Sequence, residues 1–168
     1  KKKMSEVPDP PFIPEAEADP VEYNRSTYNK LLGGASEEAI DHLTAMAIGE
    51  GRNQITRGHG TDAFKGPIWA ALNRVREHQV GDLKFKKSKH VDPVMAVITS
   101  GDFKGYHPKH LKDKDFHKYR KYVVDALNTE VHEDPTEGAT SFYSGPTPPY
   151  HKGKTETVKL GDHTYIWD

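Results

Sequence analysis

One change of periodicity, close to Pro135, limits the folds that this chain can adopt. From residue 36 to about residue 130, apolar side chains recur every three or four positions, which is typical of amphipathic helices. Beyond Pro135 the pattern shortens to alternation, with strands expected at 139–143, 157–160 and 163–167. The last two flank Gly161-Asp162, a two-residue turn typical of hairpins. Helices followed by a small antiparallel sheet define an α+β domain.

Four helices are expected before the sheet. Ser36 is a suitable N-cap for the first helix, Gly51 is expected to end it, and Pro67 is expected to open the second. Asp92 and Pro93 give the third helix the same combination of cap and first turn. The expected bounds are 37–50, 67–78, 93–101 and 115–130.

The first 35 residues differ from the rest in composition. They hold five of the twelve prolines, interspersed with acidic residues and alanine, and such a segment cannot build a core. We therefore expect a Pro/acid-rich linker or arm over 1–35 and one folded domain over 36–168. No apolar stretch is long enough for a membrane span or a secretory signal peptide, so neither is expected in this chain. A first residue Lys1 fits a piece of a larger chain or of a virion assembly.

Glu50 occupies an unusual position on the first helix. It follows Ala47 by three residues and Leu43 by seven, so at about 100° per residue its side chain lies on the apolar stripe. Burial of a carboxyl group raises its pKa, which keeps it protonated and able to donate a proton. The ordinary alternative is a glutamate at a helix end that reaches solvent or pairs with Arg52 or Arg74.

Five blocks of sequence resemble the SleB/CwlJ family of cell-wall hydrolases. The blocks are LTAMAIGEGR (43–52), GPIWAALNRV (66–75), VMAVITSGDF (94–103), GATSFY (138–143) and LGDHTY (160–165). Together they cover about 39–167 in the order of the family. The resemblance implies cleavage of peptidoglycan glycan strands, a lysozyme-like helical lobe followed by a small antiparallel sheet, and Glu50 as the general acid/base.

Three departures from the family pattern bear on the chemistry. Gln54 stands where the family has a second glutamate, and Asp102 stands where it has a glutamine. Residues 55–65, which include Asp62, form an insertion between the catalytic helix and the second helix. We expect these changes to affect substrate preference more than the reaction itself.

A single glutamate favours a lytic transglycosylase. As an acid it protonates the leaving oxygen of the MurNAc–GlcNAc β-1,4 bond, and as a base it then accepts the proton of the muramic acid 6-hydroxyl, giving a 1,6-anhydro product. Hydrolytic glycosidases instead need two carboxyl groups. A hydrolytic muramidase therefore stays open as the alternative, with Asp62 or Asp102 as the second carboxylate.

Eight further residues are candidates for binding the polysaccharide. Aromatic rings stack on sugars and polar groups bind hydroxyls, but each candidate also has an ordinary role in the core, in a strand or in fixing a loop. The candidates are Asn73, Arg74, Asp102, Phe103, Tyr106, Thr140, Phe142 and Tyr143.

Other functions have weaker support in the sequence. A zinc amidase would use His107 and His110, with His90 and Asp92 nearby, but Pro108 indicates a loop and no third ligand completes a zinc pattern, so no metal and no cofactor are expected. A net charge of −1 gives no general signal for nucleic acid. A non-enzymatic wall-binding or virion module is the other alternative. Peptidoglycan is the expected partner, and the expected place of action is the bacterial cell wall, reached by export, in a spore or by a phage.

Overall fold

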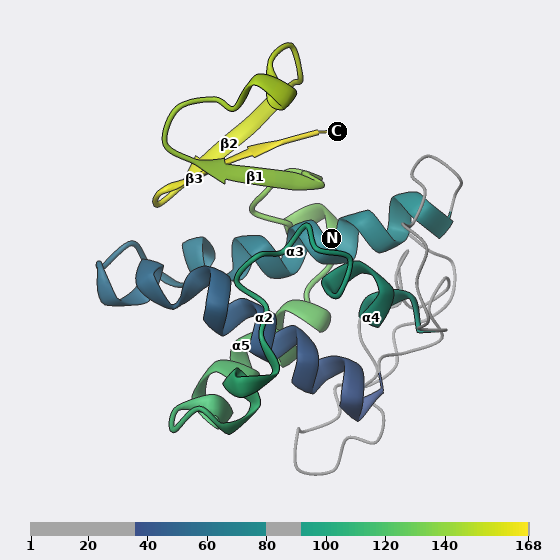
Figure 1. Ribbon diagram of the computed structural model, residues 1–168, viewed down its shortest axis with the longest axis vertical. Helices are drawn as coiled ribbons and strands as arrows, with labels where there is room; N and C mark the ends of the chain where they lie inside the picture. The colour runs from purple at the N-terminus through teal and green to yellow at the C-terminus, as the bar shows by residue number, and fades with distance from the viewer. Residues whose placement is uncertain (1–35, 80–91, 168) are drawn as a thin grey trace.

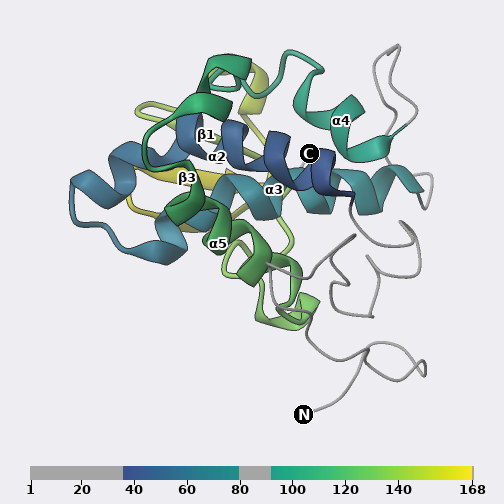
Figure 2. The same cartoon turned by 90° about the horizontal axis from the view of Figure 1, so that it is seen from below.

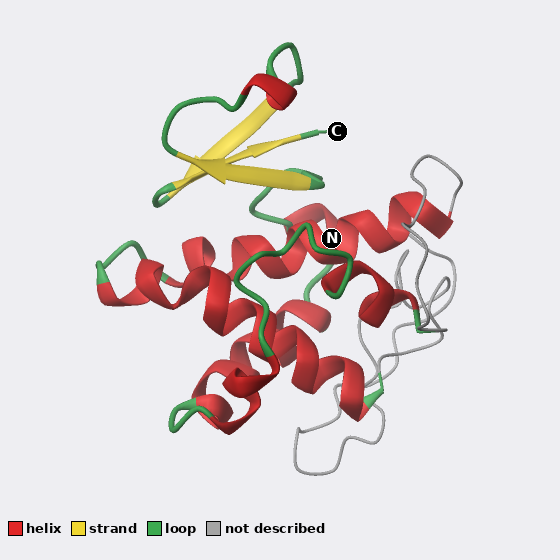
Figure 3. Cartoon of the chain, viewed as in Figure 1, coloured by secondary structure: helices red, strands yellow, loops and turns green. Residues whose placement is uncertain are grey.

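The computed structural model describes residues 36–79 and 92–167. In this part of the chain, helices form one lobe and a small sheet lies across one side of it (Figures 1 and 3). The expected α+β fold, with helices first and the sheet last, is confirmed. The arm expected at 1–35 lies outside the described residues, so the domain boundary stays a prediction.

Two long helices form the centre of the helical lobe, and two shorter ones pack against them on opposite sides (Figure 2). These helices are α2 (Glu37–Thr56), α3 (Thr61–Gln79), α4 (Pro93–Ile98) and α5 (Phe116–Leu127). Ser36 caps α2 as expected, because its hydroxyl accepts a hydrogen bond from the Ala39 N–H at 3.1 Å. Asp92 caps α4 in the same way, through the Val94 N–H at 2.8 Å.

The expected connection between the first two helices is wrong at both ends. Gly51 does not end α2 but is buried within it, where a β-carbon would lie 3.0 Å from the Phe64 carbonyl oxygen. Pro67 does not open α3 but lies inside it. A proline there removes the hydrogen bond to the carbonyl four residues earlier and crowds that carbonyl, and burial of the helix compensates for this cost. Residues 55–65 are therefore mostly helix, and only 57–60 connect α2 to α3.

One cluster of buried apolar side chains fills the helical lobe. The helices meet there through apolar side chains spaced three or four positions apart, and the short helix α4 contributes Val94, Val97 and Ile98. The cluster includes Ile40, Leu43, Met46, Ile68, Leu72, Val75, Val94, Val97, Ile98, Phe116, Tyr119, Val123, Ala126 and Leu127. None of the helices in residues 36–79 and 92–167 combines the length and the apolar character of a membrane span.

The sheet has three antiparallel strands in the order β1-β3-β2. They are β1 (Ser141–Ser144), β2 (Glu156–Leu160) and β3 (His163–Ile166), each within two residues of its expected bounds at the start and within one at the end. Tyr165 of β3 joins the sheet to α3, in a small apolar cluster with Ala70 and Ala139. A β-carbon on Gly66 would lie 1.8 Å from the Tyr165 Oη, so this contact between the lobes requires glycine on α3.

Candidate active site

Glu50 lies near the C-terminal end of α2, and its side chain is half-buried. Its Oε2 accepts a hydrogen bond from the Gly105 N–H at 2.8 Å. Gly105 belongs to the loop that follows α4, so the carboxyl group is held between a helix and a loop that are 55 residues apart in the sequence. This contact fixes the orientation of the carboxyl group.

The hydrogen bond depends on two glycines that meet backbone to backbone. A β-carbon on Gly49 would lie 1.7 Å from the Gly105 carbonyl oxygen, and one on Gly105 would lie 2.8 Å from the Glu50 nitrogen. Real β-carbons do not approach other atoms so closely. The loop therefore lies directly on α2 beside Glu50, at a distance that only a pair of glycines allows.

Burial raises the pKa of Glu50, and two weaker effects act against it. The Gly105 hydrogen bond and the positive charge of Lys104 both lower this pKa. Within the described residues Glu50 has no ion-pair partner: Arg52 binds Asp113, while Arg74 binds the Ser141 hydroxyl at 3.0 Å. The net result is a carboxyl group that holds its proton to higher pH than an ordinary glutamate does.

Tyr165 is a buried neighbour of this site. Its ring is fully buried, and its hydroxyl has no hydrogen-bond partner among the described residues. Burial raises its pKa well above the usual value, and the negative charges of Glu50 and Asp134 raise it further. The phenol therefore stays neutral, and it contributes no charge near Glu50.

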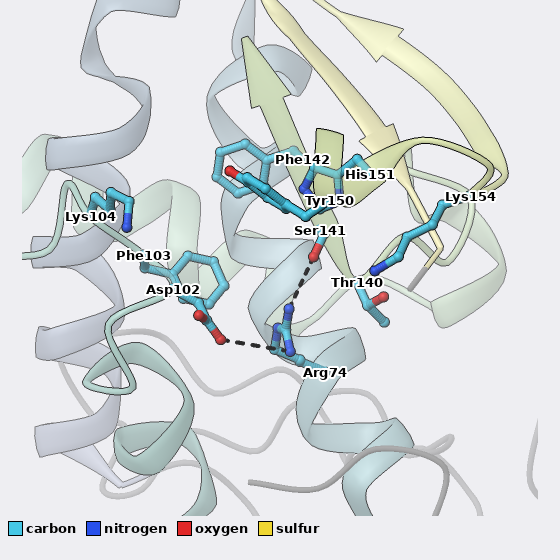
Figure 4. A pocket seen from close by; sticks show the side chains of 10 residues that line it. All are labelled: Arg74, Asp102, Phe103, Lys104, Thr140, Ser141, Phe142, Tyr150, His151 and Lys154. Carbon is cyan, nitrogen blue, oxygen red and sulfur yellow. Dashed lines mark hydrogen bonds and ion pairs between the residues drawn. The ribbon is translucent and has the colours of Figure 1, made fainter. Parts of the chain in front are cut away.

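A cavity of about 420 Å³ opens between the loop after α4 and the sheet lobe. Figure 4 shows its lining: side chains from the loop lie on one side, those from the β1–β2 connection on the other, with Arg74 of α3 and the start of β1 between them. The cavity is lined by Arg74, Asp102, Phe103, Lys104, Thr140, Ser141, Phe142, Tyr150, His151 and Lys154. Glu50 is not among these residues, but it lies next to them, because Lys104 precedes the glycine that binds its carboxyl group.

Five of the eight predicted substrate-binding residues line this cavity: Arg74, Asp102, Phe103, Thr140 and Phe142. Arg74 bridges the two sides, since its guanidinium contacts Ser141 Oγ at 3.0 Å and Asp102 Oδ2 at 3.9 Å. Phe103 and Phe142 approach each other with ring centroids 6.2 Å apart. The cavity thus offers aromatic faces and hydrogen-bonding groups together, as a saccharide site requires.

The other three predicted residues lie elsewhere and bond within the fold. Asn73 is fully buried, and its amide donates to Asp134 Oδ2 at 2.8 Å and to the Ala139 carbonyl at 2.9 Å. Asn73 thus has the ordinary role of fixing a loop to a helix. Tyr106 shares a hydrogen bond of 2.8 Å with His42 Nδ1. Tyr143 donates to Glu156 Oε2 at 2.8 Å and so braces the β1–β2 connection.

Five lining residues were not predicted from the sequence: Lys104, Ser141, Tyr150, His151 and Lys154. Ser141 lies inside the recognised block 138–143, and Lys104 directly follows the block 94–103. The other three are on the β1–β2 connection, a stretch with prolines and glycines whose sequence has no period. The structure, and not the sequence, marks Tyr150 as a candidate for binding, because 71% of this large aromatic residue is exposed to solvent.

The candidates for a second carboxylate take different positions. Asp62 is exposed in the first turn of α3, whereas Asp102 lines the cavity. Gln54, at the place of the second family glutamate, binds Asp162 through two contacts: its Nε2 lies 3.3 Å from Oδ2, and its Oε1 accepts from the Asp162 N–H at 2.9 Å. Gln54 therefore ties the hairpin turn of the sheet to α2.

Of the two histidines that a zinc site would use, His110 lies in a short 3₁₀ helix, η2 (Pro108–Lys112), and His107 directly precedes it. His107 caps it, because its Nδ1 accepts a hydrogen bond from the Lys109 N–H at 2.9 Å. Within the part of the chain that the structure describes, no group of three or more histidine, cysteine, aspartate or glutamate residues has the arrangement of a metal site. His90 lies outside the described residues.

Two solved structures have a similar fold. One is the catalytic domain of the germination-specific lytic transglycosylase SleB from Bacillus anthracis, with 20% sequence identity, a TM-score of 0.53, and coverage of 79% of this chain and 97% of that one. The other is the catalytic domain of the Bacillus cereus SleB protein, with 20% identity, a TM-score of 0.50, and coverage of 79% and 92%. No protein-family model and no curated protein matches the sequence. The resemblance to SleB and the lysozyme-like α+β architecture are thus confirmed at the level of the fold.

Proposed function

We propose that this protein cleaves the glycan strands of bacterial peptidoglycan at the MurNAc–GlcNAc β-1,4 bond, as a lytic transglycosylase. The observation that carries the proposal is the state of Glu50, a half-buried carboxyl group without a cationic partner, next to a cavity lined by aromatic and polar side chains. The name of the Bacillus anthracis neighbour, a lytic transglycosylase, supports the same reaction. Glu50 is the single acid/base, and the products end in 1,6-anhydro-muramic acid.

The hydrogen bond from Gly105 assigns the two oxygens of Glu50 different roles. Because the Gly105 N–H donates to Oε2, that oxygen acts as the acceptor and the acidic proton resides on Oε1. Oε1 then donates this proton to the glycosidic oxygen as the bond to the muramic acid carbon breaks. Burial favours this step, since the carboxyl group has to be protonated when the substrate arrives.

The second step uses the same carboxylate as a base. Once Oε1 has lost its proton, it accepts one from the 6-hydroxyl of muramic acid, and that oxygen bonds to the anomeric carbon. The Gly105 N–H stabilises the carboxylate formed between the two steps, because a hydrogen bond to an ionised group is stronger than one to a neutral group. The reaction consumes no water and returns Glu50 to its protonated form.

A hydrolytic muramidase is the second candidate, favoured by one observation. Asp102 lines the cavity together with Arg74, so a carboxylate is available beside the proposed saccharide site. In a hydrolase it would activate water or attack the anomeric carbon. The role of Asp102 separates the two reactions, because only the hydrolytic reaction requires its carboxylate.

Mass spectrometry of digested peptidoglycan tests both candidates. The transglycosylase releases anhydromuropeptides, whereas the hydrolase releases muropeptides with a reducing muramic acid end. The Asp102→Asn variant is digested in parallel: it keeps its rate of bond cleavage if Glu50 acts alone and loses it if Asp102 takes part in the chemistry. New free amines without new glycan ends would show cleavage of peptide and contradict both candidates. An unmodified polymer would remove enzymatic activity altogether and leave a wall-binding module.

The bacterial cell wall follows as the place of action, with its polysaccharide as the partner. Whether the protein reaches the wall by export, within a spore or with a phage stays a prediction of the sequence, as does its membership of a larger chain or virion.

A further inference from the structure

The walls of the cavity carry more positive than negative charge. Arg74, Lys104 and Lys154 are cationic, and Asp102 is the single acidic residue among the ten that line it. The cations come from three separate parts of the fold, namely α3, the loop after α4, and the β1–β2 connection. In Figure 4 Lys104 and Lys154 lie on opposite sides of the cavity, with Arg74 between them. Three cations against one carboxylate leave the lining with a surplus of positive charge, spread over both sides of the cavity.

Arg74 is the fixed part of this arrangement. Its side chain is largely buried on α3, and its guanidinium is positioned by Ser141 Oγ at 3.0 Å and by Asp102 Oδ2 at 3.9 Å. Asp102 balances one of the three positive charges. Lys104 and Lys154 are exposed, and the long stem of a lysine lets its ammonium group turn toward an anion that enters between them.

The same cavity offers a surface for a sugar ring. Tyr150 lines it with an aromatic face that is mostly exposed, and the His151 ring lies 4.5 Å from the Tyr150 ring, centroid to centroid. The hydroxyls of Thr140 and Ser141 lie at the start of β1, between the two lysines (Figure 4). An aromatic platform, hydroxyl groups and surplus positive charge together fit a sugar that carries a carboxylate.

From this we infer that the cavity is a subsite for the acidic substituent of muramic acid, and that the protein prefers strands on which the lactyl group carries negative charge. The inference rests on the proposed function and specifies its substrate. The negative charge has two sources, the free lactyl carboxylate of strands without peptides and the carboxylates of an attached stem peptide. Lys104 and Lys154 bind either of them.

Matched substrates test this preference. Peptide-free glycan strands are compared with the same strands after their lactyl carboxylates have been converted to methylamides, and with strands that retain stem peptides. We expect kcat/KM to be about tenfold higher on the charged peptide-free strands than on the methylamides, the range of a charge-assisted hydrogen bond to a partly exposed site. The preference decreases as salt is added. A higher value on peptide-bearing strands than on peptide-free ones would identify the stem peptide as the source of the charge.

Lys154→Gln is the decisive variant, because Lys104 also acts on Glu50. We expect the ratio of kcat/KM on charged to methylamide strands to fall at least about threefold in Lys154→Gln and further in the double variant with Lys104→Gln. Lys152→Gln is the matched control: Lys152 is exposed on the same connection but does not line the cavity, so its removal leaves the ratio unchanged.

Two outcomes overturn the inference in distinguishable ways. Equal cleavage of charged and methylamide strands, or equal ratios in Lys154→Gln and Lys152→Gln, would refute the charge preference and leave the glycan-cleaving function intact. Cleavage of none of the strands would refute the proposed function, and the inference would fall with it.

Discussion

The carboxyl groups at the two ends of α2 have opposite electrostatic environments. At the start of the helix, Glu37 and Asp41 bind one buried guanidinium, that of Arg120 on α5, at 2.6 and 2.8 Å. At the other end, Glu50 accepts one backbone N–H from Gly105 and forms no ion pair among the described residues. Both sites lie between α2 and a neighbouring element, and both hold their groups in a defined geometry. They differ in whether a cation pairs with the carboxyl group.

This difference distinguishes carboxyl groups that stabilise the fold from one that is suited to donate a proton. A carboxylate that shares an arginine is stabilised in its ionised form and helps to join two helices. A carboxyl group that is half-buried without a cation is favoured in its protonated form, which costs stability at neutral pH but provides a proton donor. One helix therefore carries a structural acid pair at one end and the proposed acid/base at the other.

The largest expected effect comes from removing the carboxyl group of the proposed acid/base. Glu50→Gln should lower kcat at least about a hundredfold, the range for loss of a general acid/base. The amide has nearly the same shape, and its oxygen still accepts a hydrogen bond from the Gly105 N–H, so the fold and strand binding should persist. Release of anhydromuropeptides over time measures the effect, and Glu133→Gln, an exposed residue, serves as the control. A fully active Glu50→Gln protein would remove Glu50 from the mechanism.

Displacement of the Gly105 loop should have the next largest effect. A β-carbon at Gly49 collides with the Gly105 carbonyl, so Gly49→Ala has to move the loop and its N–H away from Glu50. We expect a loss of stability of about 1–3 kcal/mol from overpacking, and a loss of kcat of roughly tenfold from the weakened hydrogen bond. Asn53→Ala, on an exposed position of the same helix, is the control. Unfolding by urea and kcat below the melting temperature test the two parts separately, and a normal kcat would show that the loop does not position Glu50.

Breaking the other end of α2 should change stability and spare the reaction. Arg120→Ala removes a buried guanidinium from two carboxylates, and we expect a loss of about 2–3 kcal/mol in the free energy of unfolding. Lys114→Ala removes an exposed ion pair with Asp115 and should cost less than about 0.5 kcal/mol. Both proteins should cleave strands at the normal rate well below their melting temperatures. A large loss of kcat in Arg120→Ala would contradict the division of roles along α2.

A smaller effect should appear in the pH dependence. The proposed mechanism requires protonated Glu50, so kcat/KM should fall as pH rises through a pKa above the usual range for glutamate. The positive charge of Lys104 lowers this pKa, so Lys104→Gln should move the alkaline side of the profile to higher pH, and less so at high salt. Lys109→Gln should leave the profile in place. A shift to lower pH in Lys104→Gln would contradict the assignment of the profile to Glu50.

The smallest effect concerns the stability of the Glu50→Gln protein. Folding raises the pKa of Glu50, so its contribution to stability is present below the unfolded pKa and is lost as pH rises through the folded pKa. The glutamine variant lacks this loss, and its melting temperature at pH 7 should exceed that of the parent protein by roughly 2 °C. The gap should close under acidic conditions, where both side chains are neutral. A variant that melts lower at pH 7 would show that Glu50 is stabilised as an anion.

The local sequence predicted the elements of the fold better than their junctions. Caps and periodicity located α4 from Asp92 and the hairpin from Gly161-Asp162, because these signals act within a few residues. Gly51 and Pro67 led to wrong helix bounds because their roles are not set by nearby residues. Gly51 packs closely on Phe64, and Pro67 is tolerated inside a buried helix, so tertiary contacts decide both positions.

The candidate site was predictable only where a recognised block or a periodic face contained it. The position of Glu50 on the apolar stripe indicated burial, and burial does raise its pKa. Its partner Gly105 is 55 residues away, and no local pattern links the two. Tyr150 and Lys154 were missed because the β1–β2 connection has no periodicity, and its place beside the cavity follows from the way the sheet rests on α3.

The contact between Gly105 and Glu50 also has a spectroscopic consequence. An amide that donates its hydrogen bond to a carboxyl oxygen changes its NMR resonance frequencies when that carboxyl group ionises. The backbone signal of Gly105 therefore reports the ionisation of Glu50, without substrate and without a label on the side chain. The protonation state of Glu50 can therefore be followed in the resting protein through the NMR signal of the glycine that contacts it.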